Sequence, residues 1–134
     1  MQKPKNCYVD VILCIFASDP IQPKQFKFLA DYIDYKIHFP TSDDISQKTI
    51  RTAAELLYKY TGLTARINGT GWVDLEQNLI IDSPEHLSVV YLAMIPEVVE
   101  PKKGVWWELE KFVQVELSPE VDYIIKNFMG IRNV

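Results

Sequence analysis

The stretch TAAELLYKYTGL at residues 52–63 carries the strongest structural signal of the chain. Apolar residues recur there and just before it at positions i, i+3, i+4 and i+7, the spacing of one buried helical face: Ile50, Ala53, Ala54 and Leu57. Side chains that can cap a first helical turn come earlier: Ser42, Asp43, Asp44 and Ser46. Gly62 suits the left-handed position that ends a helix, so we predict a helix over about residues 45–60.

The outer face of this predicted helix carries charges of alternating sign. Arg51, Glu55 and Lys59 follow one another at intervals of four residues, the spacing at which side chains meet on a helix surface. We therefore expect Glu55 to pair with Arg51 or Lys59.

Strands are predicted before the helix. Residues 8–17 are rich in β-branched side chains and nearly all apolar, which is typical of a central strand covered on both faces. Residues 26–30 and 35–39 are shorter candidates, and the second ends at Pro40.

More strands and a second helix are predicted after it. The strand candidates are 64–75, with a turn or bulge at 69–71, then 79–82, 87–95 and 113–117. Ser118-Pro119 is typical of a helix start, because a hydroxyl cap is followed by proline in the first turn. A helix over about 119–129 then has an apolar face: Val121, Ile124, Ile125 and Phe128. This order indicates a mixed α+β fold with helices packed on a twisted sheet.

The composition favours one ordinary globular domain. The 134 residues are 48% hydrophobic and 24% charged, so we expect a single domain over residues 1–134. A net charge of −4 argues against sequence-independent nucleic-acid binding, which needs a basic surface. The longest apolar run, Val11–Ala17, is too short to span a membrane, and no secretory signal is recognised. Cys7 and Cys14 are expected to be reduced thiols of a cytoplasmic protein.

Residues 52–63 resemble the second half of a Nudix box, whose signature is G-x(5)-E-x(7)-R-E-U-x-E-E-x-G-U, with U a bulky aliphatic residue. Phe39-Pro40 lies where family members enter the box through a proline, and residues 85–93 resemble the later family strand. Residues 106–112 are similar to the late family segment in which tryptophan precedes a short acidic and apolar turn. Ser118-Pro119 begins a last helix, as in many members. The resemblance covers almost the whole chain and implies a Nudix-like α/β/α sandwich.

The box is degenerate in this sequence. Aligned without gaps from Gly62-Leu63, its first glycine falls on Thr41 and its first glutamate falls on Gln47. The arginine position and the three later glutamate positions carry, in order, Glu55, Leu56, Lys59 and Tyr60. The helix that holds the glutamates in the family therefore keeps one carboxylate.

The resemblance implies that those glutamates hold Mg²⁺ or Mn²⁺ for the cleavage of a diphosphate. At Lys59 an ammonium would repel a divalent cation, so we expect neither a metal site nor conventional hydrolysis. Hydrolysis with Mg²⁺ would need displaced ligands, with Glu55 as the one catalytic candidate, and the residues available are Glu55, Asp43, Asp44 and Glu85. The competing interpretation is that Asp43 and Asp44 cap the helix.

The resemblance also implies a cleft that binds a nucleoside diphosphate and stacks its base on aromatic side chains. Lys59 could contact a phosphate directly, and we expect Tyr58 and Tyr60 to be exposed beside it. Trp72 is a further ligand-binding candidate, with a place in the core as its alternative. We thus expect a non-hydrolytic binder of an ADP-ribose- or NAD-like ligand, or a protein-interaction adaptor. The alternative is a Nudix hydrolase with displaced Mg²⁺ ligands.

Protein interaction has its own candidate segment. Residues 97–101, EVVEP, carry two valines that we expect to be exposed, as in an edge contact or a plain loop. A protein partner or a second copy of the chain would fit such a segment, whereas no membrane partner is expected.

Overall fold

Strand β1 (Tyr8–Ser18) lies inside a mixed sheet. The structure, a computed structural model, describes residues 8–18, 26–44, 46–84 and 86–128. On one side β1 pairs in parallel with β6 (His86–Ile95), and on the other it pairs antiparallel with β2 (Phe26–Ile33). The central position predicted for residues 8–17 is confirmed.

The other strands extend this sheet in the order β5-β6-β1-β2-β3-β8, while β4 pairs with β1 and β7 pairs with β2. Their bounds are β3 (Lys36–His38), β4 (Thr41–Ser42), β5 (Leu75–Ser83), β7 (Val105–Glu108) and β8 (Glu116–Leu117). A 3₁₀ helix, η1 (Leu109–Gln114), joins β7 to β8.

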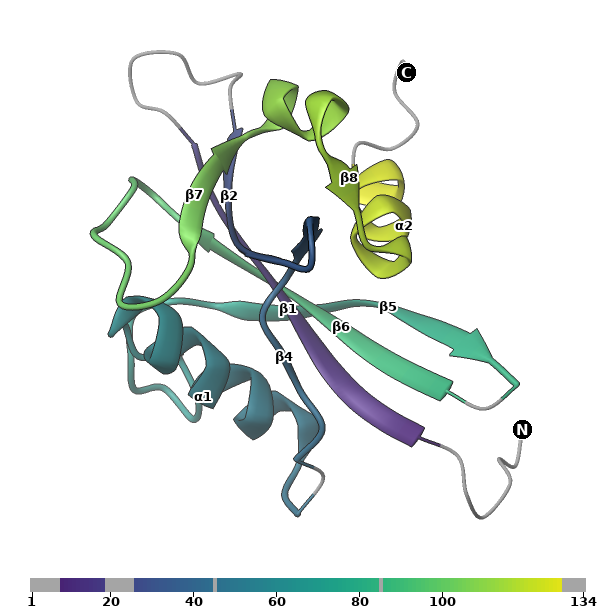
Figure 1. Cartoon of the computed structure of the whole chain (residues 1–134). Helices are drawn as coiled ribbons and strands as arrows, with labels where there is room; N and C mark the ends of the chain where they lie inside the picture. The colour runs from purple at the N-terminus through teal and green to yellow at the C-terminus, as the bar shows by residue number, and fades with distance from the viewer. Residues whose placement is uncertain (1–7, 19–25, 45, 85, 129–134) are drawn as a thin grey trace.

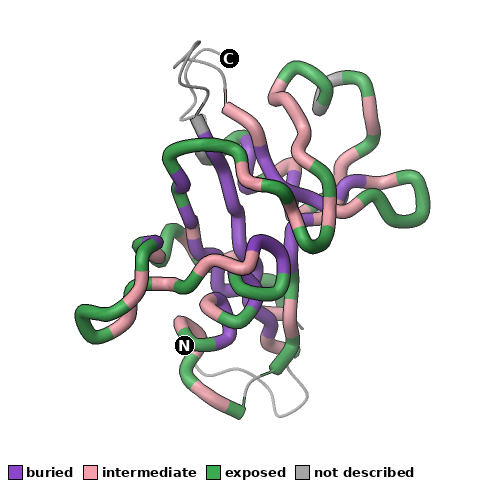
Figure 2. Tube along the Cα trace, turned by 90° about the vertical axis from the view of Figure 1, so that its left-hand side faces the viewer, coloured by how far each residue is buried: buried purple, intermediate pink, exposed green. Residues whose placement is uncertain are grey.

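The sheet has an apolar core on each face. Helix α1 (Thr49–Thr61) covers the face that receives the odd-numbered residues of β1: Val11, Leu13, Ile15 and Ala17. Helix α2 (Pro119–Phe128) covers the face that receives the even-numbered ones: Ile12, Cys14 and Phe16. Because side chains alternate along a strand, an unbroken apolar run supplies both cores. Figure 1 shows the two helices on opposite sides of β1, and Figure 2 shows the buried stretches gathered in the central strands. This is the predicted α/β/α sandwich.

Helix α1 starts four residues later than predicted and without the predicted caps. Its N-cap is Lys48, which makes no side-chain cap hydrogen bond. The Asp44 carboxylate instead accepts hydrogen bonds from the Ser46 backbone and hydroxyl, at 3.0 and 2.6 Å. The prediction that Asp43 and Asp44 cap the helix is therefore wrong, because Asp44 closes a separate turn ahead of it.

The end of α1 is as predicted. Gly62 adopts φ +78°, and its N–H donates to the Tyr58 carbonyl at 2.8 Å. That left-handed conformation costs glycine little and other residues more.

The buried face of α1 is rotated from the predicted one. Ala53 and Leu57 are fully buried, but Ile50 and Ala54 are only partly so. Leu56 and Tyr60 complete the buried stripe, at 4% and 3% exposure. Positions 53, 56, 57 and 60 also follow helical spacing, and the sheet selects this stripe because it buries the larger side chains.

Two predicted strands are mostly irregular. In residues 64–75, isolated bridges join Ala65 to Val73 and Ile67 to Thr70, around a tight turn whose Gly69 has φ +82°. The predicted turn is thus confirmed and the strand is not. In residues 113–117 only Glu116–Leu117 is a strand, because η1 occupies the preceding residues.

The second helix begins as predicted. Ser118 caps it, since its Oγ accepts from the Val121 N–H at 3.3 Å.

Cys14 is a free thiol in the core between the sheet and α2, and burial raises the pKa of that thiol. In the part of the chain that the structure describes, no helix has the length and apolar character needed to cross a membrane. Cys7, Glu85 and the final residue predicted for the second helix lie outside the described residues.

Candidate functional site

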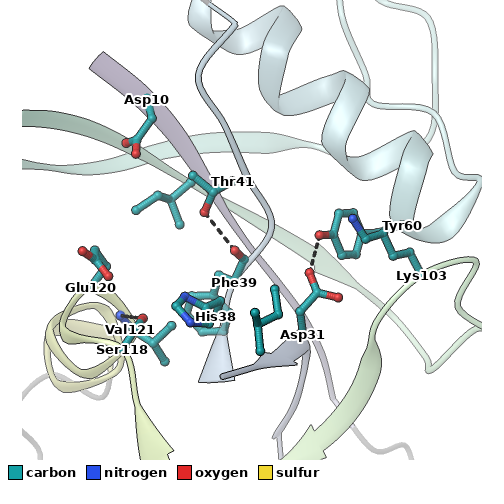
Figure 3. A pocket seen from close by; sticks show the side chains of 12 residues that line it. Asp10, Asp31, His38, Phe39, Thr41, Tyr60, Lys103, Ser118, Glu120 and Val121 are labelled. Atoms are coloured by element: carbon teal, nitrogen blue, oxygen red, sulfur yellow. Dashed lines mark hydrogen bonds between the residues drawn. The ribbon is translucent and has the colours of Figure 1, made fainter. Parts of the chain in front are cut away.

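Two cavities adjoin at β4, where Asp10 and Thr41 line both of them. The first has a volume of about 420 Å³ and opens between β1, β2, β3, and the start of α2. Its lining includes polar side chains from all of these elements: Asp10, Asp31, His38, Thr41, Tyr60, Lys103, Ser118 and Glu120. Figure 3 shows Asp10 and Glu120 at one end of this cavity and Tyr60 with Lys103 at the other.

The second cavity has a volume of about 510 Å³ and lies along α1. Four carboxylates and one ammonium line it: Asp10, Asp43, Asp44, Glu55 and Lys59. Both volumes are within the range of small-molecule sites, and the two cavities share Asp10 and Thr41 in their linings.

Asp10 is held by a histidine from the neighbouring strand. It is a residue of β1 on the α2 face of the sheet, and its exposure is 9%. Its Oδ2 lies 2.9 Å from His86 Nε2, and Ser88 Oγ lies 3.3 Å from the same nitrogen. The predicted Nudix-like strand therefore contributes His86 as a support for a carboxylate at the junction of the cavities.

The first cavity is closed at its other end by Tyr60. The Tyr60 hydroxyl donates to Asp31 Oδ2 at 2.5 Å, and Lys103 Nζ lies 5.1 Å from the centre of the Tyr60 ring. Burial, aided by the hydrogen bond and negative charge of Asp31, raises the pKa of Tyr60. The phenol therefore stays protonated and serves as a donor.

The four predicted ligand-binding residues are spread over separate places. Lys59 lines the second cavity, and Tyr60 lines the first. Tyr58 is 57% exposed and lines a third hollow beside residues 64–67, where Lys102 Nζ lies 5.6 Å from its ring centre. Trp72 is 80% exposed and lines neither of the two adjoining cavities.

Two exposure predictions are wrong. Tyr60 is buried because it follows Leu56 and Leu57 on the stripe that packs on the sheet. Of the two valines in residues 97–101 only Val98 is exposed, since Val99 packs against the core and its carbonyl accepts from Trp106 Nε1 at 2.8 Å. The alternative of a core position for Trp72 is also wrong.

The candidate metal ligands come together only in part. Asp43, Asp44 and Glu55 line the second cavity, whereas Glu85 lies outside the described residues. Each of the three is engaged in a hydrogen bond: Tyr8 donates to Asp43, Ser46 to Asp44, and Gln47 to Glu55. Glu55 thus accepts a hydrogen bond from Gln47, whereas the predicted partner was Arg51 or Lys59.

The described residues do not fit a divalent metal site of the helix-based kind. Among them, no three His, Cys, Asp or Glu side chains are grouped closely enough to hold a metal ion. Lys59 also places an ammonium in the cavity where the carboxylates are. A hard cation needs several oxygen ligands around it, and an adjacent ammonium opposes its binding.

Several cavity residues were not singled out from the sequence as site candidates. Asp10, Asp31 and Lys103 come from three separate segments, which only the folded sheet brings together. Asp10 does leave a signal, because it shares the even-numbered face of β1 with the buried residues Ile12 and Cys14. Burying a carboxylate on this face costs free energy unless the carboxylate is paired, so an aspartate at this position indicates a functional role.

The fold is similar to that of solved Nudix domains and hydrolases. The NUDIX domain of Shewanella oneidensis NrtR, complexed with ADP ribose, is 15% identical, with a TM-score of 0.65 over 91% of this chain and 86% of that one. A MutT/nudix family protein from Listeria innocua is 14% identical, with a TM-score of 0.65 over 97% and 96%. An Ap4A hydrolase from C. elegans is 15% identical, with a TM-score of 0.59 over 92% and 96%. This protein therefore has a Nudix-like fold.

Sequence comparisons add little to this assignment. No family model matches the sequence. Among curated proteins, O-fucosyltransferase 5 of Arabidopsis thaliana is 25% identical over 141 residues, which cover 98% of this chain and 23% of that protein. The chain thus spans about a quarter of the length of that relative.

Proposed function

We propose that this protein binds a nucleoside diphosphate derivative of the ADP-ribose or NAD type without hydrolysing it. The observation that carries the proposal is Lys59, which stands in the second cavity at a position where the Nudix signature has glutamate. A lysine there supplies a fixed positive charge to a phosphate, a task that a metal ion would otherwise perform.

The charges of the cleft suggest how such a ligand lies. Among the described residues, each cavity has one lysine in its lining, Lys103 in the first and Lys59 in the second. Because the carboxylates of the second cavity repel phosphate oxygens, a diphosphate is expected at one of these ammonium groups and away from Asp10. The Tyr60 hydroxyl keeps its proton on Asp31, so its ring forms part of the wall beside Lys103 and donates nothing to the ligand.

The comparison with solved structures supports the class of ligand. The NrtR domain was solved with ADP ribose, and the C. elegans protein is an Ap4A hydrolase. Both ligands named there contain adenosine and linked phosphates. The cavity volumes of about 420 and 510 Å³ leave room for a ligand of that size.

Titration calorimetry with ADP-ribose, NAD and ADP tests the proposal, first with EDTA and then with Mg²⁺. We expect binding of at least one compound in EDTA and no product by chromatography after long incubation with Mg²⁺. Lys59→Met should weaken that binding about 10-fold or more, because a hydrogen bond to a charged group is lost. Lys126→Met is the matched control, since Lys126 pairs with Asp122 on α2 and lines neither cavity.

Two results would overturn the proposal. If none of the compounds binds, the cleft is not a nucleotide site and the protein-interaction alternative gains support. If a diphosphate is cleaved in Mg²⁺, the protein is an enzyme. That second function has one observation in its favour, because Asp43, Asp44 and Glu55 line the same cavity.

A further inference from the structure

The carboxylate of Asp10 has one oxygen without a hydrogen bond. Among the described residues, nothing pairs with Asp10 Oδ1, although its accessible area is below 1 Å². A buried carboxylate oxygen normally has a partner, because leaving it unpaired costs the free energy of its lost hydration. Asp10 is thus a group with an unused capacity to accept a hydrogen bond.

The surroundings hold this carboxylate in place. His86 Nε2 lies 2.9 Å from Oδ2, and the ring of Tyr8 meets the His86 ring edge-on at 5.9 Å between centres. Ser88 Oγ lies 3.3 Å from the same histidine nitrogen. Since one oxygen is committed to His86, the other is the one that a further group can use.

The position of Asp10 indicates that a ligand in the cavities can supply the hydrogen-bond donor. Asp10 lines both cavities, and Figure 3 shows it on the same side of the first cavity as Glu120, away from Tyr60. Its side chain is 12% exposed, so part of it faces the space that a molecule bridging the cavities would fill. No other side chain of the described part of the chain lines both cavities except Thr41.

We infer that Asp10 is a specificity-determining residue that accepts a hydrogen bond from a neutral donor group of the ligand at the junction of the two cavities. The inference rests on the proposed function. A phosphate is repelled by this carboxylate, so the donor belongs to the sugar or the base. The donor is therefore a hydroxyl or an amino group, which a deoxy or deamino analogue of the ligand lacks.

The test compares ADP-ribose with analogues that each lack one donor group. These lack the adenosine 2′-hydroxyl, the adenosine 3′-hydroxyl, the exocyclic amino group (IDP-ribose) or the terminal ribose (ADP). In the unmodified protein, we expect one removal to weaken binding about 10- to 100-fold, the effect of losing a hydrogen bond to a charged group. The analogue that shows the loss distinguishes sugar from base.

Substitution of Asp10 should erase that discrimination. In Asp10→Ala, ADP-ribose and the sensitive analogue should bind with dissociation constants within about 3-fold of each other. Asp10→Asn, which keeps an acceptor oxygen and the size of the side chain, should retain part of the discrimination and serves if Asp10→Ala does not fold. Asp74→Asn is the control, because Asp74 is exposed, pairs with Arg66 and lines neither cavity.

The outcomes separate this inference from the proposed function. If ADP-ribose binds and no analogue binds more weakly, the inference is wrong while the binding function stands. The same holds if Asp10→Ala and Asp10→Asn discriminate as the unmodified protein does, since Asp10 would then only support His86. If no compound binds to the unmodified protein, the proposed function itself fails.

Discussion

The two ends of α1 are built in different ways. At the end of the helix, Gly62 caps the backbone, the Tyr60 hydroxyl bonds to Asp31, and the Lys102 N–H donates to the Tyr60 carbonyl at 2.8 Å. At its start, Lys48 offers no side-chain cap, and the helix is approached through the Asp44–Ser46 turn. One end is fixed by contacts to β2 and to residue 102, whereas the other has the Thr49 hydroxyl 2.7 Å from that of Tyr91 in β6, preceded by a short exposed turn.

The end of α1 borders both cavities, through Tyr60 and Lys59, and the turn before its start borders the second. Tyr60 lines the first cavity, so the wall there is fixed by the same contacts that end the helix. Asp44 lines the second cavity, where Lys59 lies. We therefore expect the wall of the first cavity at Tyr60 to be more rigid than the turn that lines the second. Four substitutions test this comparison.

The largest effect is expected at the fixed end, from Tyr60→Ala. Because Tyr60 is 3% exposed and packs on the core, its truncation should lower the free energy of unfolding by about 3–5 kcal/mol. Tyr58→Ala, two residues earlier and 57% exposed, should cost less than about 1 kcal/mol. Urea denaturation measures both, and equal losses would show that the fixed end is not anchored by Tyr60.

The next effect is expected from Gly62→Ala. Its φ of +78° is strained for alanine, so the substitution should destabilise by about 1–2 kcal/mol. The added Cβ would also lie 2.7 Å from Lys102 Cε, a flexible atom that can move away. Gly69→Ala is the control, because it has a similar φ of +82° with nothing within 4 Å of the added atom. A gain in stability in Gly62→Ala would contradict the capping role.

The same contrast explains what could be predicted from the sequence. The central strand, the helix end at Gly62 and the start of α2 at Ser118 depend on local backbone preferences, and all three are confirmed. The start of α1 was predicted from capping residues that instead form a turn and pair with β1. Local propensity could not decide between these uses, because tertiary pairing selects one of them.

The candidate site could be predicted less completely than the fold. Lys59 followed from the spacing of the Nudix signature, and it does line a cavity. Tyr60 was expected to be exposed, yet it is buried because the sheet determines which stripe of α1 it covers. Asp10, Asp31 and Lys103 are far apart in the sequence, so their convergence requires the strand order.

A smaller effect is expected at the start of α1, from Lys48→Ser. Lys48 already has the extended backbone of an N-cap, with φ −61° and ψ 144°, but lacks a capping side chain. A serine hydroxyl there can accept from a free N–H of the first turn, which should stabilise the protein by about 0.5–1 kcal/mol over Lys48→Ala. Both variants remove the lysine charge, so their difference isolates the cap. Equal stability of the two variants in thermal unfolding would show that the N–H groups of the first turn already have hydrogen-bond partners.

The smallest effect is expected in the turn before the helix, from Ser46→Ala. The side-chain and backbone hydrogen bonds of Ser46 hold the pKa of Asp44 below its ordinary value of 3.8. A carboxyl whose pKa is lowered by folding contributes stability above the unfolded value, and that contribution is lost as the pH falls through the folded value. Ser46→Ala removes the hydroxyl but keeps the backbone N–H, so it should raise the pKa of Asp44 and weaken this part of the acid dependence, whereas Ser46→Thr, which keeps a hydroxyl, should preserve most of it. NMR titration of the Asp44 carboxyl measures the change. An unchanged pKa in Ser46→Ala would mean that the turn is not held by this contact, and the wall of the second cavity would then need another support.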